Sequence, residues 1–450
     1  MRPDPGAPSR PMPGTRDAID ADGGAEGRLR SVPWRALAGI APSLDAPIAA
    51  VLRGESAERV VDRTLKHHRQ LDRIGRAAVA EALFGVAVWR RRLAYQLGRD
   101  DASPRMLLAS LLRDLGGLAD GAAVAGLLPC ALPDPRPPPI ELADRYSLPP
   151  WLAATLVAEA GDDAELLADA LGQPGPVCLR PNGLRTSAAE LALALQREGV
   201  VTRAGRIVPT SLVIQSPRPN VYGLRAWRDG AFEVQDEGSQ LVGALVAARP
   251  GDEVLDLCAG AGGKTLQLAA AVGASGLVHA ADPDQERLER LERRASRAGA
   301  TSIVRIHGAH PPPGLSADRV LVDAPCSELG ALRRGPDARF RLDPRSFERF
   351  PSIQLGILEK AVAHLRDGGR LVYATCTFRR EENEAVALAF ERAHPGLRRV
   401  TPRLDVVATP GSFIRTWPHR HGCDGFFVAI WERPDEGTGG DGCDSAPRPP

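Results

Sequence analysis

Two cysteines in the second half of the chain lie where predicted strands end. Cys326 follows the apolar run DRVLVDA within DAPCSELG, and Cys376 ends the run LVYATC. Because the carboxyl ends of parallel strands meet at one edge of a sheet, both thiols can face the same cleft, with Asp323 beside Cys326. A thiolate is a strong nucleophile, but a single cysteine at a strand end is more commonly a small buried side chain. Two thiols at one edge therefore favour covalent chemistry, and either of them can be the attacking group.

A glycine-rich loop at the same edge indicates a cofactor site. The stretch LDLCAGAGGKT (255–265) leaves a predicted strand, turns on three glycines and enters a helix. A phosphate-binding P-loop would need glycine at position 258, where this chain has Cys258, so that interpretation is disfavoured. Asp282 ends the next predicted strand and can accept hydrogen bonds from ribose hydroxyls. NAD and S-adenosylmethionine both fit this arrangement, and the loop alone does not separate them.

The combination of thiols with S-adenosylmethionine points to methylation of cytosine at carbon 5. Carbon 5 is a poor nucleophile until a thiolate adds to carbon 6 and forms a covalent intermediate whose carbon 5 can attack the methyl sulfonium. A carboxyl group at ring nitrogen 3 favours the addition, and a base must later remove the proton from carbon 5. Asp323, Cys326 and Cys376 can supply these roles.

The elements around these residues predict a doubly wound α/β sheet. Strands are expected at EVLDLCA, GLVHAAD, SIVRIHG, DRVLVDA and RLVYATC, with helices near 264–272, 284–298, 344–365 and 381–394. A last strand, GFFVAIWER, closes the domain. Ligands of such a sheet bind outside the carboxyl ends of the strands, where the two cysteines are expected.

The N-terminal part has the apolar spacing of helices and an excess of positive charge. Between Arg53 and Arg92 there are ten basic and five acidic side chains, so the region can hold phosphates, although a solvated charged face explains the same composition. The predicted divisions of the chain are a disordered tail (1–30), a helical domain (31–135), a proline-rich linker with a helix (136–170), a small α+β subdomain (171–245), the catalytic domain (246–433) and a second disordered tail (434–450).

The overall composition fits a globular protein of two or three domains. Of the 450 residues, 43% are hydrophobic and 25% are charged. No apolar run reaches the roughly 18 residues that a membrane helix needs, and the N-terminus shows no secretory signal, so a cytoplasmic location without a membrane partner is expected. The seven cysteines include no CxxC pair, which disfavours a zinc site and a disulfide framework. We expect a monomer without a metal.

Four motifs in the catalytic half resemble a known family. In chain order, DLCAGAGGKT, VLVDAPCSELGALRRGPD, LVYATCTFRREEN and HGCDGFF are similar to the motifs of the RNA 5-methylcytosine methyltransferases (Nol/Nop/Sun). The N-terminal part resembles the NusB-like RNA-binding domain of the bacterial 16S rRNA members. The resemblance implies a class I, Rossmann-like S-adenosylmethionine-dependent methyltransferase sheet, preceded by an all-α NusB-like domain and a small α+β subdomain, acting on RNA and above all on 16S rRNA.

The resemblance also implies roles for individual residues. RNA enzymes of this family attack with the Thr-Cys cysteine and use the Pro-Cys cysteine to help resolve the adduct, so Cys376 is the expected nucleophile and Cys326 the helper; DNA enzymes attack with the Pro-Cys cysteine. Arg333 and Arg334 either bind phosphates that flank the target base or are ordinary surface arginines. Cofactor contacts are implied for Cys258, Ala259, Gly260, Ala261, Gly262, Gly263, Lys264, Asp282 and Asp323.

Several positions depart from the family pattern. Ala261 and Arg380 replace prolines, Ala309 stands where an acid approaches the adenine ring, and Glu328 and Leu329 replace Gly-Thr. These changes leave a second interpretation open, an RNA-binding or ribosome-assembly factor whose cofactor pocket has decayed. An enzyme of the same family acting on tRNA is a further alternative. DNA methylation is disfavoured by the Thr-Cys cysteine and by the lack of a large target-reading insertion.

Overall fold

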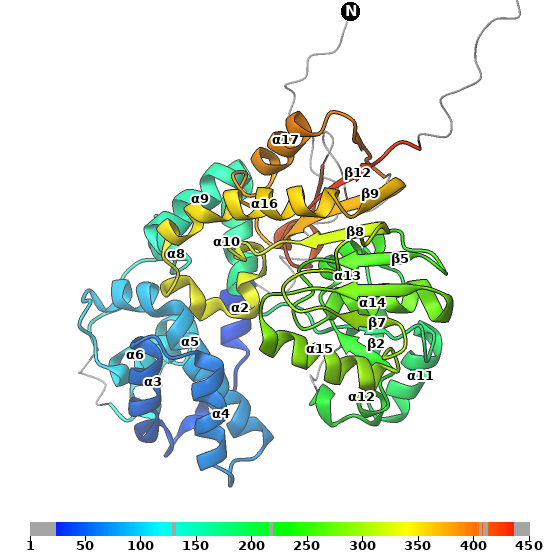
Figure 1. Ribbon diagram of the computed structural model, residues 1–450. Coiled ribbons are helices and arrows are strands. Elements are labelled where there is room, and N and C mark those ends of the chain that lie inside the picture. The colour runs from blue at the N-terminus through cyan, green and yellow to red at the C-terminus, as the bar shows by residue number, and fades with distance from the viewer. Residues whose placement is uncertain are drawn as a thin grey trace, which may run out of the picture. The chain divides into compact units, whose positions relative to one another are not determined.

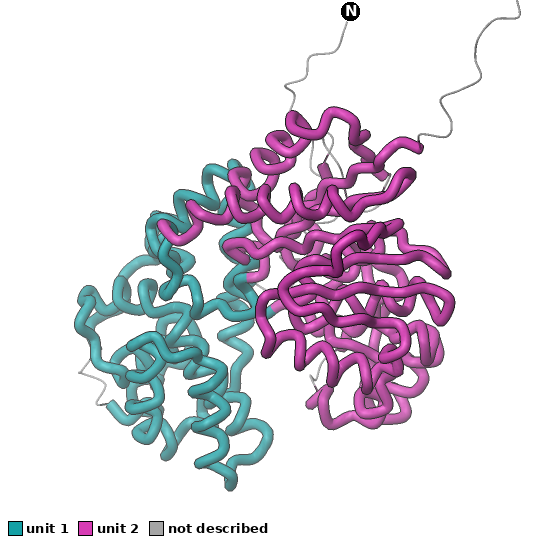
Figure 2. Tube along the Cα trace, viewed as in Figure 1, with its two compact units in different colours: residues 1–174, 332–344 teal, residues 175–331, 345–450 magenta. Residues whose placement is uncertain are grey.

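The computed structural model describes residues 24–127, 132–215, 219–402, 404, 407 and 413–435. Two compact units can be separated along the chain (Figure 2). The helical unit comprises residues 1–174 and 332–344, and the sheet unit comprises residues 175–331 and 345–450. The two predicted disordered tails lie outside the described residues, except for 24–30 and 434–435.

The helical unit is built around one long helix. Helix α5 (Arg73–Leu97) starts after Asp72, whose side chain accepts the N–H of Gly75 at 2.7 Å, and ends at Gly98 in a left-handed conformation. Its buried side chains, including Trp89, share one apolar core with the neighbouring helices. The other helices are α2 (Gly24–Arg30), α3 (Asp45–Leu52), α4 (Ala57–His67), α6 (Pro104–Ser110), α7 (Gly121–Val124), α8 (Leu142–Arg145), α9 (Pro150–Ala160) and α10 (Ala164–Gly172), with single turns η1 (Trp34–Leu37), η2 (Ala41–Leu44), η3 (Leu111–Leu115) and η5 (Gly161–Asp163). Within the part of the chain that the structure describes, no helix has the length and apolar character needed to cross a bilayer.

Helix α2 occupies residues that were predicted to belong to the disordered N-terminal tail. Ala25 and Leu29 are buried in the core of the helical unit. The indole N–H of Trp34 donates to the carbonyl of Leu29 at 2.9 Å, and Asp169 accepts the N–H of Ala25 at 3.1 Å. The prediction is therefore wrong for 24–30, because two apolar residues in a polar stretch are enough to bury one face of a short helix.

Residues 332–344 belong to the helical unit, although they were predicted as part of a continuous catalytic domain. Turn η9 (Pro336–Phe340) carries the fully buried Arg339, which donates to the carbonyl of Leu171 at 2.8 Å. Asp337 accepts the backbone N–H of Ala57 at 3.1 Å. These contacts join residues far apart in the sequence, so local periodicity gives no sign of them.

The first part of the sheet unit is a small antiparallel sheet with helices. Its strands are β1 (Cys178–Pro181), β2 (Thr202–Ala204), β3 (Leu212–Ile214) and β4 (Phe232–Val234), in the order β2-β3-β1-β4. Helices α11 (Ala188–Arg197) and α12 (Arg225–Arg228) contribute to the same apolar core. Helix α13 (Glu237–Leu245), which was predicted within this α+β subdomain, instead packs in the core of the larger sheet through Leu241, Val242 and Leu245.

The larger sheet is doubly wound, as the sequence predicts. Its strands are β5 (Glu253–Asp256), β6 (Leu277–Ala280), β7 (Val304–Ile306), β8 (Ala317–Asp323), β9 (Leu365–Thr375), β10 (Arg398–Arg399), β11 (Ile414–Arg415) and β12 (Phe427–Glu432). The order is β10-β12-β9-β8-β5-β6-β7, with β11 beside β12. Strands β5 to β9 pair in parallel, whereas β12 runs antiparallel to β9.

Helices cover both faces of this sheet. Successive residues of each strand point to opposite sides, so the apolar runs place hydrophobic side chains on both faces, and both faces need to be covered. Leu321 and Val372 pack with α13, α14 (Gly263–Val272) and α15 (Gln285–Ala298) on one face. Val322 and Leu371 pack with α16 (Phe350–Val362) and α17 (Glu384–Ala393) on the other, and Figure 1 shows these two helices beside β9. The carboxyl ends of β5, β8 and β9 are neighbours at one edge of the sheet.

Candidate functional site

Glycines shape the loop that follows β5. Gly260 and Gly262 have left-handed backbones, with φ of 52° and 85°, which other residues adopt only at a cost. A Cβ added at Gly262 would lie 2.2 Å from a methyl group of Leu291, so the loop packs directly on α15. A Cβ added at Gly260 or Gly263 would meet no atom within 4 Å. The backbone of these two residues therefore borders open space, as a cradle for a ligand requires.

Asp282 lies two residues after β6 and is bonded to this loop. Its side chain is buried, Oδ2 accepts the N–H of Gly260 at 2.9 Å, and Oδ1 accepts the N–H of Asp284 at 2.8 Å. Each carboxylate oxygen has a second lone pair, so Asp282 can also accept hydrogen bonds from ribose hydroxyls. The acid, the open glycine cradle and the N-terminus of α14 together fit S-adenosylmethionine.

Lys264, in the first turn of α14, is paired with the acid that ends β8. Its Nζ lies 2.7 Å from Oδ2 of Asp323 and 5.2 Å from the ring centre of Phe426. Oδ1 of Asp323 forms no hydrogen bond with any residue that the structure describes. The lysine thus holds one oxygen of Asp323 in place and leaves the other for a ligand.

Two further side chains lie beneath the loop, the buried Asp256 and the half-buried Cys258. Burial raises the pKa of Asp256 to about 7, while Oδ2 accepts a hydrogen bond from Thr265 at 2.8 Å. Burial, and secondarily the charge of Asp256, raises the pKa of the Cys258 thiol well above its ordinary value. Cys258 is therefore suited to contact a cofactor through its backbone and unsuited to act as a nucleophile.

The departures in and near the cofactor loop have structural replacements. The carbonyl of Ala261 accepts a hydrogen bond from Arg294 at 2.5 Å, and the same guanidinium pairs with Glu233 at 2.9 Å. This anchor holds the loop at the position where the family pattern has a proline. Ala309 is exposed, and the neighbouring carbonyl of Gly308 accepts the N–H of Asp282 at 2.8 Å. The backbone just before Ala309 is therefore bonded to Asp282, although the side chain of Ala309 adds no polar group.

The two cysteines meet at the ends of β8 and β9. The sulfurs of Cys326 and Cys376 are 3.4 Å apart; Cys326 is buried and Cys376 is half-buried. The hydrogen bond with Cys326, followed by burial, raises the pKa of the Cys376 thiol well above its ordinary value. The structure therefore brings together the two thiols and, through the neighbouring strand ends, Asp323 and Lys264.

A buried acid ties the Cys326 loop to the segment after Cys376. Glu382 accepts the N–H of Ser327 at 2.9 Å, its hydroxyl at 2.6 Å and the amide of Gln354 at 3.1 Å. Gln354 also donates to the carbonyl of Pro325 at 3.0 Å. Burial raises the pKa of Glu382, while its bonds to Ser327 oppose that rise. Three donors thus converge on one carboxyl group that fixes the loop around Cys326.

Asn383, the next residue, fixes the backbone around Cys376 in the same way. Asn383 accepts the hydroxyl of Thr375 at 2.5 Å and donates to the carbonyl of Thr377 at 3.0 Å, so it brackets Cys376. Sequence reasoning assigned no role to Glu382 or Asn383. The available signal was the run EEN directly after the Thr-Cys motif, where two polar residues are fully buried.

Two glycines bring the HGCDGFF motif against the cysteine loops. Gly330 donates to the carbonyl of Cys376 at 2.9 Å and accepts the N–H of Gly425 at 2.9 Å. A Cβ added at Gly330 would lie 2.1 Å from the carbonyl oxygen of Gly425. Glycine at position 330, which this chain shares with the family pattern, is therefore required for this close approach.

Glu328 departs from the pattern at a position with an unusual backbone. Its φ is 57°, in the left-handed region that favours glycine, and its side chain is exposed. Its charge is among the causes that raise the pKa of Cys376. The adjacent Leu329 is fully buried. The loop keeps the backbone shape of a glycine residue and carries a carboxylate near the thiols.

The two arginines predicted to bind RNA differ in exposure. Arg333 is buried and Arg334 is exposed, at the end of turn η8 (Leu329–Arg334). Both lie in the part of the chain that belongs to the helical unit, not in the unit that holds the thiols. Among the described residues, no group of histidine, cysteine, aspartate or glutamate side chains is arranged to hold a metal ion.

Comparisons with known proteins show which proteins this chain is similar to. The family described as "16S rRNA methyltransferase RsmB/F" matches residues 244–432, and its "ferredoxin-like domain" matches residues 148–221. A probable ribosomal RNA small subunit methyltransferase B of Synechocystis is 32% identical over 64% of this chain and 68% of its own length. The putative methyltransferase Rv1407 of Mycobacterium tuberculosis is 35% identical over 74% of this chain and 73% of its own length. The crystal structure of PH0851 covers 90% of this chain and 99% of its own, with 25% identity and a TM-score of 0.71.

Proposed function

Because the chain belongs to the RsmB/F family of S-adenosylmethionine-dependent methyltransferases, we propose that it methylates carbon 5 of a cytosine in RNA, with 16S rRNA as substrate. The observation that carries the proposal is the pair of sulfurs 3.4 Å apart at the ends of β8 and β9. Covalent activation of a pyrimidine uses one thiolate to add to the ring and a second group to help release it. The resemblance of the N-terminal sequence to NusB-like RNA-binding domains supports a nucleic-acid substrate.

In the proposed reaction, Cys376 releases its proton to solvent and its sulfur forms a bond to carbon 6 of the cytosine, which moves the electron pair of the double bond between carbons 5 and 6 onto carbon 5. Asp323 directs its unpaired Oδ1 toward ring nitrogen 3, while Lys264 holds the other oxygen. S-adenosylmethionine, when held by residues 258–264 and Asp282, supplies the methyl group that carbon 5 takes up. Cys326, having lost its own proton to solvent, accepts the proton of carbon 5 and later returns it to solvent. The electron pair of that C–H bond re-forms the double bond between carbons 5 and 6, and the bond between sulfur and carbon 6 breaks with its electron pair returning to Cys376.

The substrate assignment is tested by methyl transfer from labelled cofactor to RNA. We expect label in small-subunit RNA, at a cytosine that becomes resistant to bisulfite conversion. The target base must leave its stack to reach the thiols, so an unpaired or opened site is expected. A lack of transfer to every rRNA and tRNA pool would overturn the proposal, and transfer only to tRNA would replace its substrate.

The roles of the two cysteines predict opposite phenotypes. Cys376→Ala should abolish both methyl transfer and the covalent protein–RNA adduct, because no thiolate can add to carbon 6. Cys326→Ala should accumulate an adduct that survives denaturation, because release is impaired. Denaturing gels with labelled RNA report the adduct, and Cys178→Ala, which changes a buried cysteine in strand β1 outside the four motifs, serves as control. If Cys326→Ala instead abolished the adduct, the nucleophile would be in the DAPC loop.

A non-catalytic RNA-binding factor on the same fold remains the rival function. The open cradle beside Gly260 and Gly263 and the Arg294 anchor on Ala261 favour a working pocket. Calorimetric titration of the purified protein with S-adenosylmethionine discriminates the two, since a decayed pocket gives no binding.

A further inference from the structure

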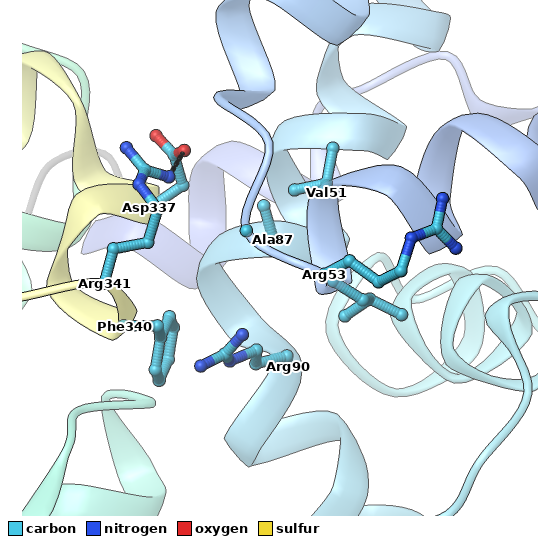
Figure 3. A pocket seen from close by; sticks show the side chains of 9 residues that line it. Val51, Arg53, Ala87, Arg90, Asp337, Phe340 and Arg341 are labelled. Atoms are coloured by element: carbon cyan, nitrogen blue, oxygen red, sulfur yellow. Dashed lines mark hydrogen bonds and ion pairs between the residues drawn. The ribbon is translucent and has the colours of Figure 1, made fainter.

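The helical unit contains a cavity that the proposed chemistry does not use. It has a volume of about 250 Å³ and lies between α3, α5 and the segment around η9. Figure 3 shows Arg90 beside the ring of Phe340, with Arg341 and Asp337 close by, and the guanidinium of Arg53 pointing away from them. The cavity therefore has a basic lining with one acid.

The single acid does not neutralise this lining. Asp337 is buried, accepts the N–H of Ala57 at 3.1 Å, and is ion-paired with Arg341. Arg90 forms no hydrogen bond or ion pair with any residue that the structure describes. Burial, followed by the like charge of Arg341, lowers the pKa of Arg90. A half-buried guanidinium beside a second one is unfavourable unless an anion lies between them.

The guanidinium of Arg90 is also held in a fixed orientation. Its Cζ lies 3.7 Å from the centre of the Phe340 ring, a close cation–π contact. This contact keeps the guanidinium at the face of the ring, and its N–H groups have no partner among the described residues. A fixed, unpaired guanidinium is well suited to bind phosphate oxygens, for which it supplies two parallel donors.

A second cavity continues from the first. It has a volume of about 870 Å³ and shares Leu52, Arg90 and Phe340 with the smaller cavity. Its lining adds Arg136, whose Cζ lies 5.9 Å from the ring centre of Tyr95 and which has no hydrogen-bond or ion-pair partner among the described residues. An arginine over an aromatic ring thus occurs twice along one groove. This repeat fits a polymer of phosphates and bases better than a single small anion.

We propose that this groove binds an unpaired stretch of the substrate RNA, with one backbone phosphate at Arg90 and Arg341 and another at Arg136. The inference rests on the proposed function for the identity of the RNA. Phe340 and Arg341 belong to the segment that begins six residues after Cys326, so RNA bound in the groove contacts the same stretch of chain that leaves the cysteine loop. Bound RNA would therefore restrain the segment adjoining that loop.

The test compares two double variants of the full chain. Arg90→Gln/Arg136→Gln removes two unpaired guanidiniums of the groove, and Arg59→Gln/Arg73→Gln removes two exposed arginines of the same unit outside it. Binding of a fluorescent single-stranded RNA is measured by anisotropy over a range of salt concentrations without cofactor. We expect the groove variant to bind about tenfold more weakly than wild type, with a salt slope smaller by roughly 0.7 for each lost phosphate contact. The control should change binding by less than about threefold.

A stability measurement separates binding from a structural role. Because Arg90 is unpaired and faces Arg341, the single variant Arg90→Gln should keep or raise the melting temperature while RNA binding falls. Equal RNA binding by the groove and control variants would overturn the proposal. The proposal would also be overturned if Arg90→Gln/Arg136→Gln weakened the binding of inorganic phosphate or a mononucleotide in titrations but left RNA affinity unchanged. These assays contain no cofactor, so a failure of methyl transfer would refute the proposed function and leave the binding result standing.

Discussion

The loop after β5 and the loop after β8 hold neighbouring parts of one site by different means. The first takes its shape from glycines, with left-handed turns at Gly260 and Gly262 and a surface made of backbone. The second has a left-handed turn at a non-glycine residue, Glu328, and is held by hydrogen bonds from Ser327 to the buried Glu382. A site made of backbone tolerates new side chains where they point away, whereas a site held by side chains depends on every buried acceptor.

Asp256 provides the strongest test of this comparison, because it is a buried side chain beneath the glycine loop. Its pKa is raised from 3.8 to about 7, so the carboxyl favours the protonated form in the folded protein. A carboxyl group whose pKa is higher in the folded than in the unfolded protein stabilises the fold at pH values below the unfolded pKa. This stabilisation is lost as the pH rises through the folded pKa. Wild type should therefore lose up to about 4 kcal/mol of unfolding free energy, relative to Asp256→Asn, between about pH 4 and pH 7.

Urea unfolding of both proteins across that range measures the difference. Asp252→Asn is a matched control, because this aspartate lies before the same strand and shows no comparable burial. Parallel pH curves for wild type and Asp256→Asn would mean that the carboxyl is ionised in the folded protein. The glycine loop would then rest on a buried charge, and the contrast between the two loops would fail.

Glu382→Ala should have the next largest effect and tests the side-chain-held loop directly. The substitution leaves three donors without their acceptor, two from Ser327 and one from Gln354. Misplacement of the Cys326 loop should lower kcat by about a hundredfold, and the affinity for S-adenosylmethionine, measured by calorimetry, should stay within about threefold. Glu381→Ala changes the exposed neighbour and should leave kcat within about twofold. Loss of cofactor binding in Glu382→Ala would show that the two loops are not independent.

Much of the sheet and the meeting of the two cysteines could be predicted, because both follow from local patterns. The short continuous apolar runs in DRVLVDA and RLVYATC mark buried strands, and parallel strands bring their carboxyl ends to one edge. The glycines of the cofactor loop and Asp282 follow from the same rule. These predictions needed only local sequence patterns and did not depend on contacts between residues distant in the sequence.

The parts that sequence reasoning missed depend on contacts between distant segments. Arg339 is buried against the carbonyl of Leu171, which removes residues 332–344 from the catalytic sheet and adds them to the helical unit. Glu382 is buried because it bonds a loop that lies 55 residues earlier in the chain. A charged residue in a polar run predicts exposure, and only the fold shows that donors from elsewhere surround it.

Glu328→Gly should have the smallest effect and removes the feature that makes the second loop unusual. Relief of the left-handed φ of 57° should stabilise the protein by about 1 kcal/mol, a difference that thermal unfolding can measure. Loss of the carboxylate should also lower the pKa of Cys376, since the charge of Glu328 contributes to its rise, and should shift the pH profile of adduct formation to lower pH. Glu328→Gln separates the two effects, because it removes the charge and keeps the strained backbone. If both variants shift the pH profile but only Glu328→Gly raises stability, the carboxylate acts on the thiols and the backbone strain is the cost of placing the carboxylate at this position. If neither variant shifts the pH profile, the carboxylate has no influence on Cys376, and the second loop is held by Ser327 and Glu382 alone.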